Sequence, residues 1–220
     1  MSAQLIRLEA APDLADQVYR TLVDAIGDGN LPPGQRLTQE DIAAKLAVSR
    51  QPVLQALRLL KADGLVQDAP GRGLQVAPLD AELIASVYQV RAALDRLAAR
   101  LAAMQRASID PRLIDHGRKA ARGRDIRAMI DADLAFHQAI YAASGNPLIE
   151  PSALVHWRHV RRAMGASLQR LPMRETVWDE HQAIAAAIAA GKADRAEALI
   201  SAHDERASEH MTRLMAAGDT

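Results

Sequence analysis

Apolar residues recur at spacings of three and four along most of this 220-residue chain, which predicts a mainly helical protein. Near the N-terminus such stripes predict three helices, interrupted by "GDGNLPPGQ" at 27–35 and by the short turn "AVS" at 47–49. Thr38 and Ser49 precede the second and third helices and are residue types that cap helix N-termini. Two extended runs, "LVQD" and "LQVAP", flank "APGRG" and predict a β-hairpin. This order of elements predicts a winged helix-turn-helix.

The helical pattern continues from Asp80 to the C-terminus, where glycine and proline residues divide it into six segments. The predicted helices lie near 81–105, 110–122, 125–143, 147–170, 174–190 and 193–216. Short connections between helices favour an antiparallel bundle. The sequence therefore predicts a mainly α fold with two domains: a winged helix-turn-helix at 1–78 and a six-helix antiparallel bundle at 79–220.

Composition narrows the possible classes of protein. The absence of cysteine excludes disulfides, thiol nucleophiles and metal sites with cysteine ligands. No apolar run approaches the ~20 residues needed to span a bilayer, and the N-terminus lacks the apolar core of a signal peptide. We therefore expect a cytoplasmic protein without a membrane partner. A net charge of zero neither requires nor excludes nucleic acid.

The third predicted helix has the side chains of a DNA-reading element at its N-terminus. A guanidinium there, such as that of Arg50, can pair with guanine O6 and N7 in the major groove, and the wing residue Arg72 can reach a phosphate or the minor groove. The candidate DNA-binding residues are Arg36, Ser49, Arg50, Gln51, Gln55, Arg58 and Arg72. Residues 36–72 hold six basic and four acidic side chains, and winged helices also bind proteins, so these residues leave a protein-binding module open.

Histidine and aspartate residues in the bundle form a candidate metal site. Asp133 and His137 lie one helical turn apart on the face that carries Ile130 and Ile140, so both can bind one metal ion. The alternative is that the histidine is a hydrogen-bonded core residue and the aspartate is solvated. His181 and His203 lie on apolar faces of two later helices, and histidines on three such faces are costly to bury unless they share a partner.

The other histidines are interpreted as surface or ancillary residues: His116, His156, His159 and His210, of which His210 competes most closely as a ligand.

Arg91 is the second unusual polar residue of the bundle, because it lies within an apolar stripe and needs an anion. Two anions could pair with its guanidinium. One is the carboxylate of Asp95, one turn further on, in an internal ion pair, and the other is a bound acid.

Residues 13–78 resemble the DNA-binding domain of the GntR family of bacterial transcription regulators. The resemblance is carried by "LPPGQRLTQEDIAAKLAVSRQPVLQALRLLKADGLV" followed by "GRGLQV". It implies a double-stranded DNA operator, a palindrome read by a homodimer. The sequence departs from the family at Leu54, where arginine is usual and helps to hold the operator, and at the neighbouring Gln55, where an acidic residue is usual.

The second half resembles the FCD effector domain of the FadR subfamily, through "DLAFHQAIYAASGNPLI" and "EHQAIAAAIAAGKADRAEALISAH". Six helices are typical of the VanR-like branch. The resemblance implies a divalent metal on Asp133, His137, His181 and His203, with zinc the first choice and nickel, manganese or iron as alternatives. It also implies that Arg91 faces the carboxylate of a small organic acid effector, and Asn146 is a further candidate effector-binding residue.

Three functions follow from these features. The first is a homodimeric transcription regulator, in the family most often a repressor, whose bundle senses a small carboxylate. The second is a metal-dependent enzyme with an accessory winged helix, although no spare general base or phosphate-binding glycine loop is evident. In the third the metal is structural and there is no effector.

Overall fold

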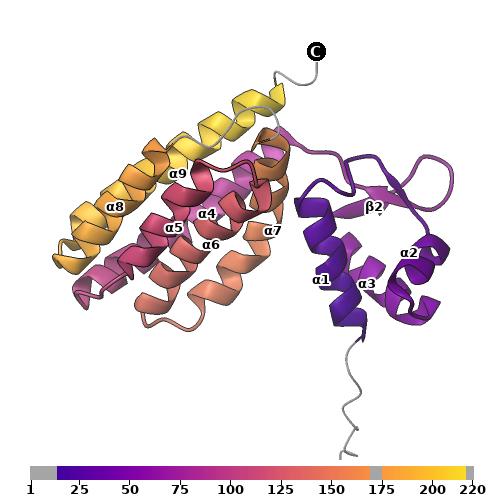
Figure 1. Cartoon of the computed structure of the whole chain (residues 1–220), viewed down its shortest axis with the longest axis horizontal. Coiled ribbons are helices and arrows are strands. Elements are labelled where there is room, and N and C mark those ends of the chain that lie inside the picture. Colours follow the sequence, from indigo (N-terminus) through magenta and orange to yellow (C-terminus); the bar gives the residue numbers. More distant parts are fainter. Residues whose placement is uncertain (1–13, 169–174, 217–220) are drawn as a thin grey trace, which may run out of the picture. The chain divides into compact units, whose positions relative to one another are not determined.

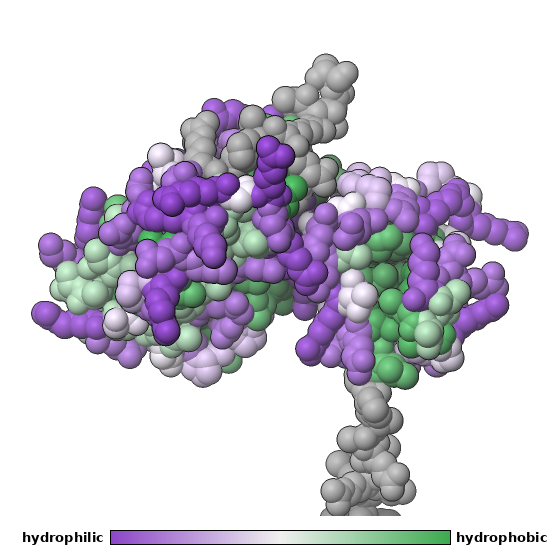
Figure 2. All heavy atoms as spheres, viewed as in Figure 1, coloured by the Kyte–Doolittle hydropathy of each residue, from purple (hydrophilic) through white to green (hydrophobic). Residues whose placement is uncertain are grey.

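A computed structural model describes residues 14–168 and 175–216 (Figure 1). The described chain divides into two compact units, the first formed by residues 14–26 and 31–77 and the second by residues 27–30 and 78–216. Each unit buries its own hydrophobic core. Within the described ranges, no helix is both long and apolar enough to cross a bilayer. On the face shown in Figure 2, hydrophilic side chains cover much of each unit and hydrophobic patches lie between them.

The first unit is a winged helix-turn-helix. Its elements are α1 (Leu14–Gly27), β1 (Arg36–Leu37), α2 (Gln39–Leu46), α3 (Arg50–Ala62), β2 (Val66–Asp68) and β3 (Leu74–Val76). The strands form an antiparallel sheet in the order β1-β3-β2. The hairpin of β2 and β3 follows the sequence prediction, whereas β1 was not predicted because two residues are too few to show a periodicity. Gly71 and Gly73 have φ angles of 90° and 96°, which the turn between these strands requires and which glycine adopts without strain.

The N-caps of α2 and α3 differ from each other. Thr38 caps α2, since its hydroxyl accepts a hydrogen bond from the backbone nitrogen of Asp41 at 3.2 Å. Ser49 occupies the N-cap position of α3, but its hydroxyl makes no capping hydrogen bond, so the expected cap is wrong in this detail. The turn between the helices places Ala47 in the left-handed conformation, with φ of 51°. The exposed hydroxyl of Ser49 therefore does not bond to the backbone nitrogens at the start of α3.

The second unit is a bundle of six helices within the described residues. They are α4 (Ala81–Met104), α5 (Pro111–Ala121), α6 (Ile126–Ala143), α7 (Ile149–Leu168), α8 (Thr176–Ala189) and α9 (Ala193–Ala216). These bounds agree with the sequence prediction to within two residues, except that the predicted ends at 170 and 174 lie outside the described residues. Helix α4 packs along α9 and also contacts α6, α7 and α8, so it is the central helix of the bundle.

Close packing between α5 and α8 positions the part of α8 that carries His181. Trp178 is fully buried over Gly117, where an added Cβ would lie only 2.0 Å from the indole ring. His181 follows one turn later and stacks on Phe136 of α6, with ring centroids 4.1 Å apart. The position of His181 therefore depends on side-chain packing. Gly117 leaves room for the indole of Trp178, and the ring of Phe136 packs against the imidazole of His181.

Candidate metal centre and ligand cavity

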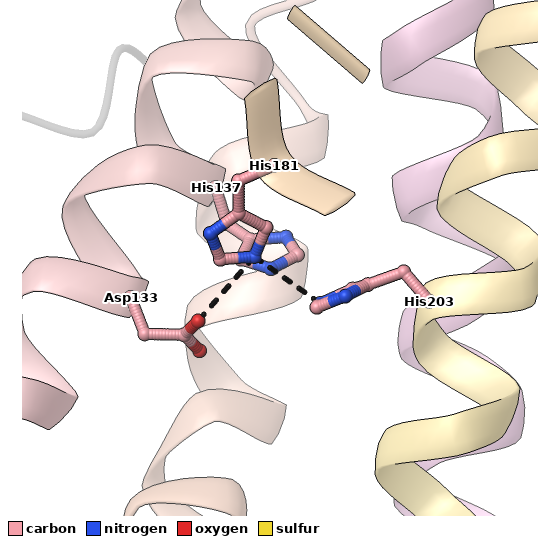
Figure 3. A group of neighbouring side chains, drawn as sticks. All are labelled: Asp133, His137, His181 and His203. Atoms are coloured by element: carbon pink, nitrogen blue, oxygen red, sulfur yellow. Dashed lines mark hydrogen bonds and ion pairs between the residues drawn. The ribbon is translucent and has the colours of Figure 1, made fainter. Parts of the chain in front are cut away.

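Four side chains from three helices converge in the core of the second unit. Asp133 and His137 come from α6, His181 from α8 and His203 from α9, and all four are buried. One ligand atom from each lies within 4.8 Å of those of the other three (Figure 3). These are the four residues predicted from the sequence, and the fold brings them together.

Two separations between these atoms match those of ligands around one ion. Nε2 of His181 lies 3.3 Å from Nε2 of His203 and 3.5 Å from Oδ1 of Asp133. Two nitrogens bound to zinc at ~2.0–2.1 Å with a tetrahedral angle lie about 3.3 Å apart. The spacing of His181, His203 and Asp133 therefore needs little adjustment to admit a metal ion.

The unsatisfied nitrogens of the cluster also fit a metal. Neither Nδ1 nor Nε2 of His137 makes a hydrogen bond with any described residue, although the side chain is fully buried. An unpaired buried polar atom costs ~1–3 kcal/mol, so such atoms usually have a partner or a function. A metal ion accepts the lone pair of an imidazole nitrogen and removes this cost at the nitrogen that binds it.

The charges buried around the cluster point to a dication. Asp95, Asp133 and Asp204 bring three carboxylates and Arg91 one guanidinium, all of them buried. With neutral histidines, three negative charges and one positive charge leave a net charge of −2. A divalent cation would neutralise this excess, which is otherwise costly in a core of low dielectric.

The histidines themselves are held in the form that binds metals. Burial, with the charge of Arg91 second, lowers the pKa of His137 to about 3. Burial and the neighbouring His203 and His137 lower the pKa of His181 well below its usual value. Both imidazoles are neutral near pH 7, and a neutral imidazole offers a lone pair without first losing a proton.

His203 has a carboxylate partner behind it that sequence reasoning missed. Its Nδ1 donates to Oε2 of Glu180 at 2.9 Å, and the other oxygen of Glu180 accepts from Nε of Arg206 at 2.9 Å. Burial opposes a charge on His203, but the hydrogen bond to Glu180 and the nearby carboxylates outweigh it and raise the pKa of His203. The contact leaves Nε2 directed to the cluster (Figure 3), as in carboxylate–histidine–metal arrangements. The one available signal was that Glu180 directly precedes His181.

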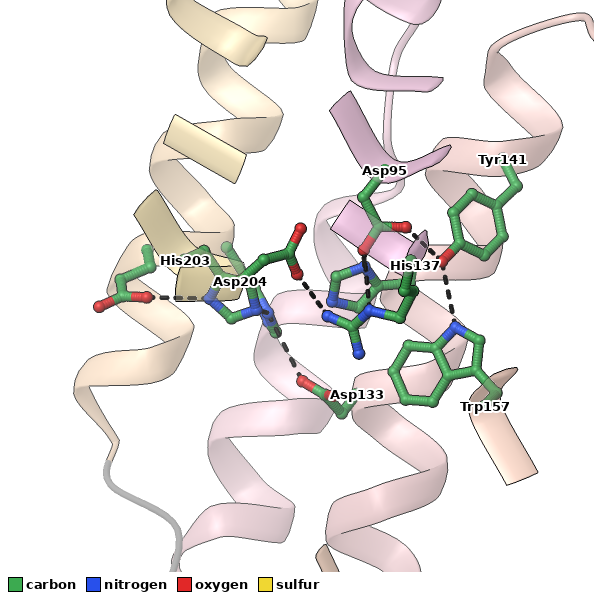
Figure 4. A network of polar contacts seen from close by, with 10 residues as sticks. Asp95, Asp133, His137, Tyr141, Trp157, His203 and Asp204 are labelled. Atoms are coloured by element: carbon green, nitrogen blue, oxygen red, sulfur yellow. Dashed lines mark hydrogen bonds and ion pairs between the residues drawn. The ribbon is translucent and has the colours of Figure 1, made fainter. Parts of the chain in front are cut away.

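Arg91 belongs to a buried polar network. Figure 4 shows two carboxylates of this network, Asp95 and Asp204, near His137 and His203. Its Nε is 3.1 Å from Oδ2 of Asp95, and a terminal nitrogen donates to Oδ1 of Asp204. The guanidinium also stacks between Tyr88 and Trp157, with its carbon 4.9 and 4.6 Å from their ring centroids. Of the two alternatives that the sequence left open, the ion pair with Asp95 is present, and Asp204 is a second partner that the sequence did not indicate.

The network continues from Asp95 into α6. Oδ1 of Asp95 accepts from the hydroxyl of Tyr141 at 2.5 Å, and that hydroxyl accepts from Nε1 of Trp157 at 3.1 Å. Oδ2 of Asp95 lies 3.4 Å from Nδ1 of His137. Arg91 and a candidate metal ligand therefore share one carboxylate, which links α4 to α6.

A cavity of about 240 Å³ adjoins the cluster. Asp133 and His203 line it together with Arg91, so the candidate metal position and the arginine face the same space. Apolar walls come from α7, α8 and α9, and His210 also lines the cavity. Asn146 does not: it lies in the turn before α7, where its side-chain oxygen accepts from the backbone nitrogen of Leu148 at 3.0 Å.

The candidate DNA-binding residues are all exposed on the first unit: Arg36, Ser49, Arg50, Gln51, Gln55, Arg58 and Arg72. Arg50 forms an ion pair with Glu40 at 2.6 Å, with both side chains 67% exposed. Arg36 donates to the backbone oxygens of Pro70 and Arg72 at 2.7 and 3.1 Å and so supports the wing. At the position where the sequence departs from its resemblance, Leu54 is half-buried and Gln55 exposed.

Comparison with known families identifies both parts of the chain. Residues 14–76 match the bacterial regulatory proteins of the gntR family, and residues 86–206 match the FCD domain.

Individual relatives are similar to this chain over most of its length. The HTH-type transcriptional regulator LutR of Bacillus subtilis is 31% identical, with 81% of this chain and 92% of LutR covered. A probable D-xylose utilization operon transcriptional repressor of Paenarthrobacter nicotinovorans is 28% identical, with 86% and 85% covered. The crystal structure of a putative GntR regulator from Rhodococcus sp. RHA1 is similar, with a TM-score of 0.74, 27% identity, and 90% and 96% of the two chains covered.

Proposed function

The chain belongs to the gntR family of bacterial regulatory proteins with an FCD domain, and on that premise we propose that it is a metal-containing repressor that responds to a small carboxylate. It is a transcription regulator and not an enzyme, like the relatives it matches along its length. The name of the D-xylose relative supports repression as the direction of regulation. The proposed site of action is the cytoplasm, on a palindromic operator bound by a homodimer.

Asp133, His137, His181 and His203 would hold one divalent ion, zinc in the first instance, with nickel, manganese or iron as alternatives. The observation that carries this proposal is the convergence of four buried ligand atoms within 4.8 Å of one another. When bound, the ion supplies a Lewis-acidic position that a carboxylate oxygen can occupy.

The cavity beside the cluster supports a small organic acid as effector. Asp133 and His203 line both the cluster and the cavity, so a molecule in the cavity would lie against the ion. Arg91 adds positive charge at the same wall, but Asp95 and Asp204 already hold it. Its first role is therefore to position these carboxylates, and the carboxylate of an effector would add to this network.

The start of α3 and the wing would read the operator. Ser49, Arg50 and Gln51 are exposed at the N-terminal turn of α3, where major-groove contacts arise in helix-turn-helix proteins. The exposed ion pair of Arg50 with Glu40 is worth ~0–1 kcal/mol and yields readily to a guanine or phosphate contact. The Arg72 side chain at the wing tip would contact phosphate or the minor groove.

An effector can control operator binding only if it binds the DNA-competent and incompetent forms with different affinity. A mobility-shift titration tests this with the full chain, DNA from its own gene region, and a panel of organic acids with and without zinc. We expect specific shifts that one acid reverses only in the metal-loaded protein. The absence of any sequence-specific shift would contradict the proposal that the chain binds an operator. If the metal is purely structural, no acid will change DNA binding or the melting temperature.

A further inference from the structure

Ser167 is a buried serine of α7 whose hydroxyl has no hydrogen-bond partner among the described residues. The residue is 5% exposed, and its Oγ belongs to the buried side-chain atoms without a hydrogen bond. An unpaired buried hydroxyl is destabilising, so such a group usually has a partner or a function. The hydroxyl of Ser167 therefore requires an explanation that the fold alone does not supply.

Other hydroxyls in the described helices bond to the backbone of their own helix. Oγ of Ser86 donates to the carbonyl oxygen of Glu82 at 2.9 Å, and the hydroxyl of Thr212 donates to that of Ser208 at 2.9 Å. A serine in a helix can reach the carbonyl oxygen four residues earlier in this way. The hydroxyl of Ser167 does not make this bond, so it is available to a molecule outside the helix.

Helix geometry places Ser167 on the wall of the ligand cavity. Helix α7 contributes Met164, Ser167 and Leu168 to this wall, and their spacing of three and four puts them on one face of the helix. The hydroxyl of Ser167 is therefore the polar side-chain group of an otherwise apolar wall. The candidate metal ligands Asp133 and His203 line the same cavity, so an acid bound at the ion shares its space with Ser167.

We infer that Ser167 binds a hydroxyl group of the effector, which makes the effector a small hydroxy acid. This inference rests on the proposed function, because it takes an acid bound at the ion and names a second group of that acid. The cavity of about 240 Å³ has the volume of about eight water molecules at ~30 Å³ each, which suits an acid of about three to five carbons.

The surroundings of Ser167 favour a neutral hydroxyl over a second carboxylate. A hydroxyl both donates and accepts, so it can exchange a hydrogen bond with Ser167 in either direction. A carboxylate against α7 would have one neutral donor between the apolar side chains of Met164 and Leu168. Burying a charge with so few partners is costly. The arginines that line the cavity belong to α4 and α9 instead.

A series of four-carbon acids tests the inference on the zinc-loaded full chain. Butyrate is compared with 2-, 3- and 4-hydroxybutyrate, and isothermal titration calorimetry measures each dissociation constant. We expect at least one hydroxylated acid to bind roughly tenfold more tightly than butyrate, because it pairs a hydroxyl that butyrate leaves unpaired. Ser167→Ala should remove this preference while the affinity for butyrate stays the same. A preference that is unchanged in Ser167→Ala comes from another contact and would overturn the inference.

Two further comparisons exclude side-chain size and charge as the cause. Ser167→Cys keeps the side chain near its original size but is a weak hydrogen-bonding group, so it should also lose the preference. Succinate, which carries a second carboxylate, should bind less tightly than the preferred hydroxylated acid. A preference retained in Ser167→Cys, or tighter binding of succinate than of every hydroxylated acid, would contradict the assignment.

The stability of the ligand-free chain separates a binding role from a structural one. Ser167→Ala should leave the melting temperature unchanged or raise it, because the lost hydroxyl has no described partner. Ser144→Ala is the matched control, since this buried serine donates to the carbonyl oxygen of Tyr141 at 2.6 Å and accepts from the backbone nitrogen of Asn146 at 3.1 Å. Ser144→Ala should lower the melting temperature and retain the preference. An equal decrease in Ser167→Ala would make Ser167 structural and overturn the inference.

The failure of this inference can be told apart from failure of the proposed function. If the wild type binds butyrate without preferring any hydroxylated acid, or binds none of the four, the contact with Ser167 is wrong, and the mobility shift still tests the regulator. If binding depends on Ser167 but no acid changes operator binding, the contact stands and the ligand-responsive regulator does not.

Discussion

Nδ1 of His203 donates to Glu180 at 2.9 Å, so one ring nitrogen is fixed by a carboxylate while the other faces Asp133 and His181. This relationship selects the tautomer of His203 and holds its ring in place before any ion arrives. Partners of this kind raise the basicity of a metal ligand and reduce the freedom that metal binding must remove.

Glu180→Gln should therefore weaken zinc binding by ~10–100-fold, because the substitution removes the charge that supports His203. Competition with a chromogenic chelator measures the affinity. Asp179→Asn is the control: Asp179 is the exposed neighbour of Glu180 and pairs with Arg118 at 2.7 Å. If both variants lose zinc affinity equally, the loss comes from the change of surface charge on α8 and not from the contact with His203.

Removal of the metal should lower the melting temperature, because an ion that binds only the folded chain stabilises it by about 2.7 kcal/mol at a hundredfold excess over its dissociation constant. His181→Gln should abolish this metal-dependent stabilisation, whereas the exposed His116→Gln should retain it. Differential scanning calorimetry with and without chelator measures the difference. A shift of the same size in His181→Gln would show that the ion binds elsewhere.

Arg91→Met should destabilise the fold by ~3–5 kcal/mol, since it leaves Asp95 and Asp204 buried without their counter-ion. A second substitution, Asp204→Asn, should recover part of the loss because it removes one of the stranded charges. Urea unfolding measures both, with Arg195→Ala at an exposed position of α9 as the control. Unchanged stability in Arg91→Met would instead indicate that Arg91 acts only in binding the effector.

Gly117→Ala should cost ~1–3 kcal/mol, because the new methyl group would overlap the ring of Trp178. It should also weaken zinc binding, since a displaced Trp178 shifts His181 on the same helix. Trp178→Phe in the same chain should relieve the overlap and restore part of the affinity. Lys119→Ala, an exposed position on α5, should change neither stability nor affinity.

Arg50→Ala should weaken binding to the specific operator by ~1–3 kcal/mol, the usual contribution of a bidentate arginine–guanine contact. Stability should change little, because the pair with Glu40 is exposed. Fluorescence anisotropy with specific and scrambled DNA separates base reading from phosphate contact, and Arg20→Ala on α1 serves as a control. An equal loss on both DNAs would make Arg50 a phosphate contact.

The sequence by itself determined the helices, the wing hairpin and the four candidate ligands. Helix periodicity, capping residues and the glycine and proline breaks act locally, and they placed the described bundle helices to within two residues. Asp133 and His137 lie one turn apart on one helix, so their proximity needed no tertiary information.

Only the tertiary structure decided the partners that come from distant segments. Asp204 reaches Arg91 across 113 residues and Glu180 reaches His203 across 23, and neither shares a helix with its partner. Helix α4 shows the same limit. The spacing of Leu83, Val90 and Leu97 by seven residues is present in the sequence, but their exposure is known only once the other helices have packed against the opposite face of α4. The spacing of residues in the sequence determines which side chains share a face of a helix. The packing between helices determines which residues that face contacts.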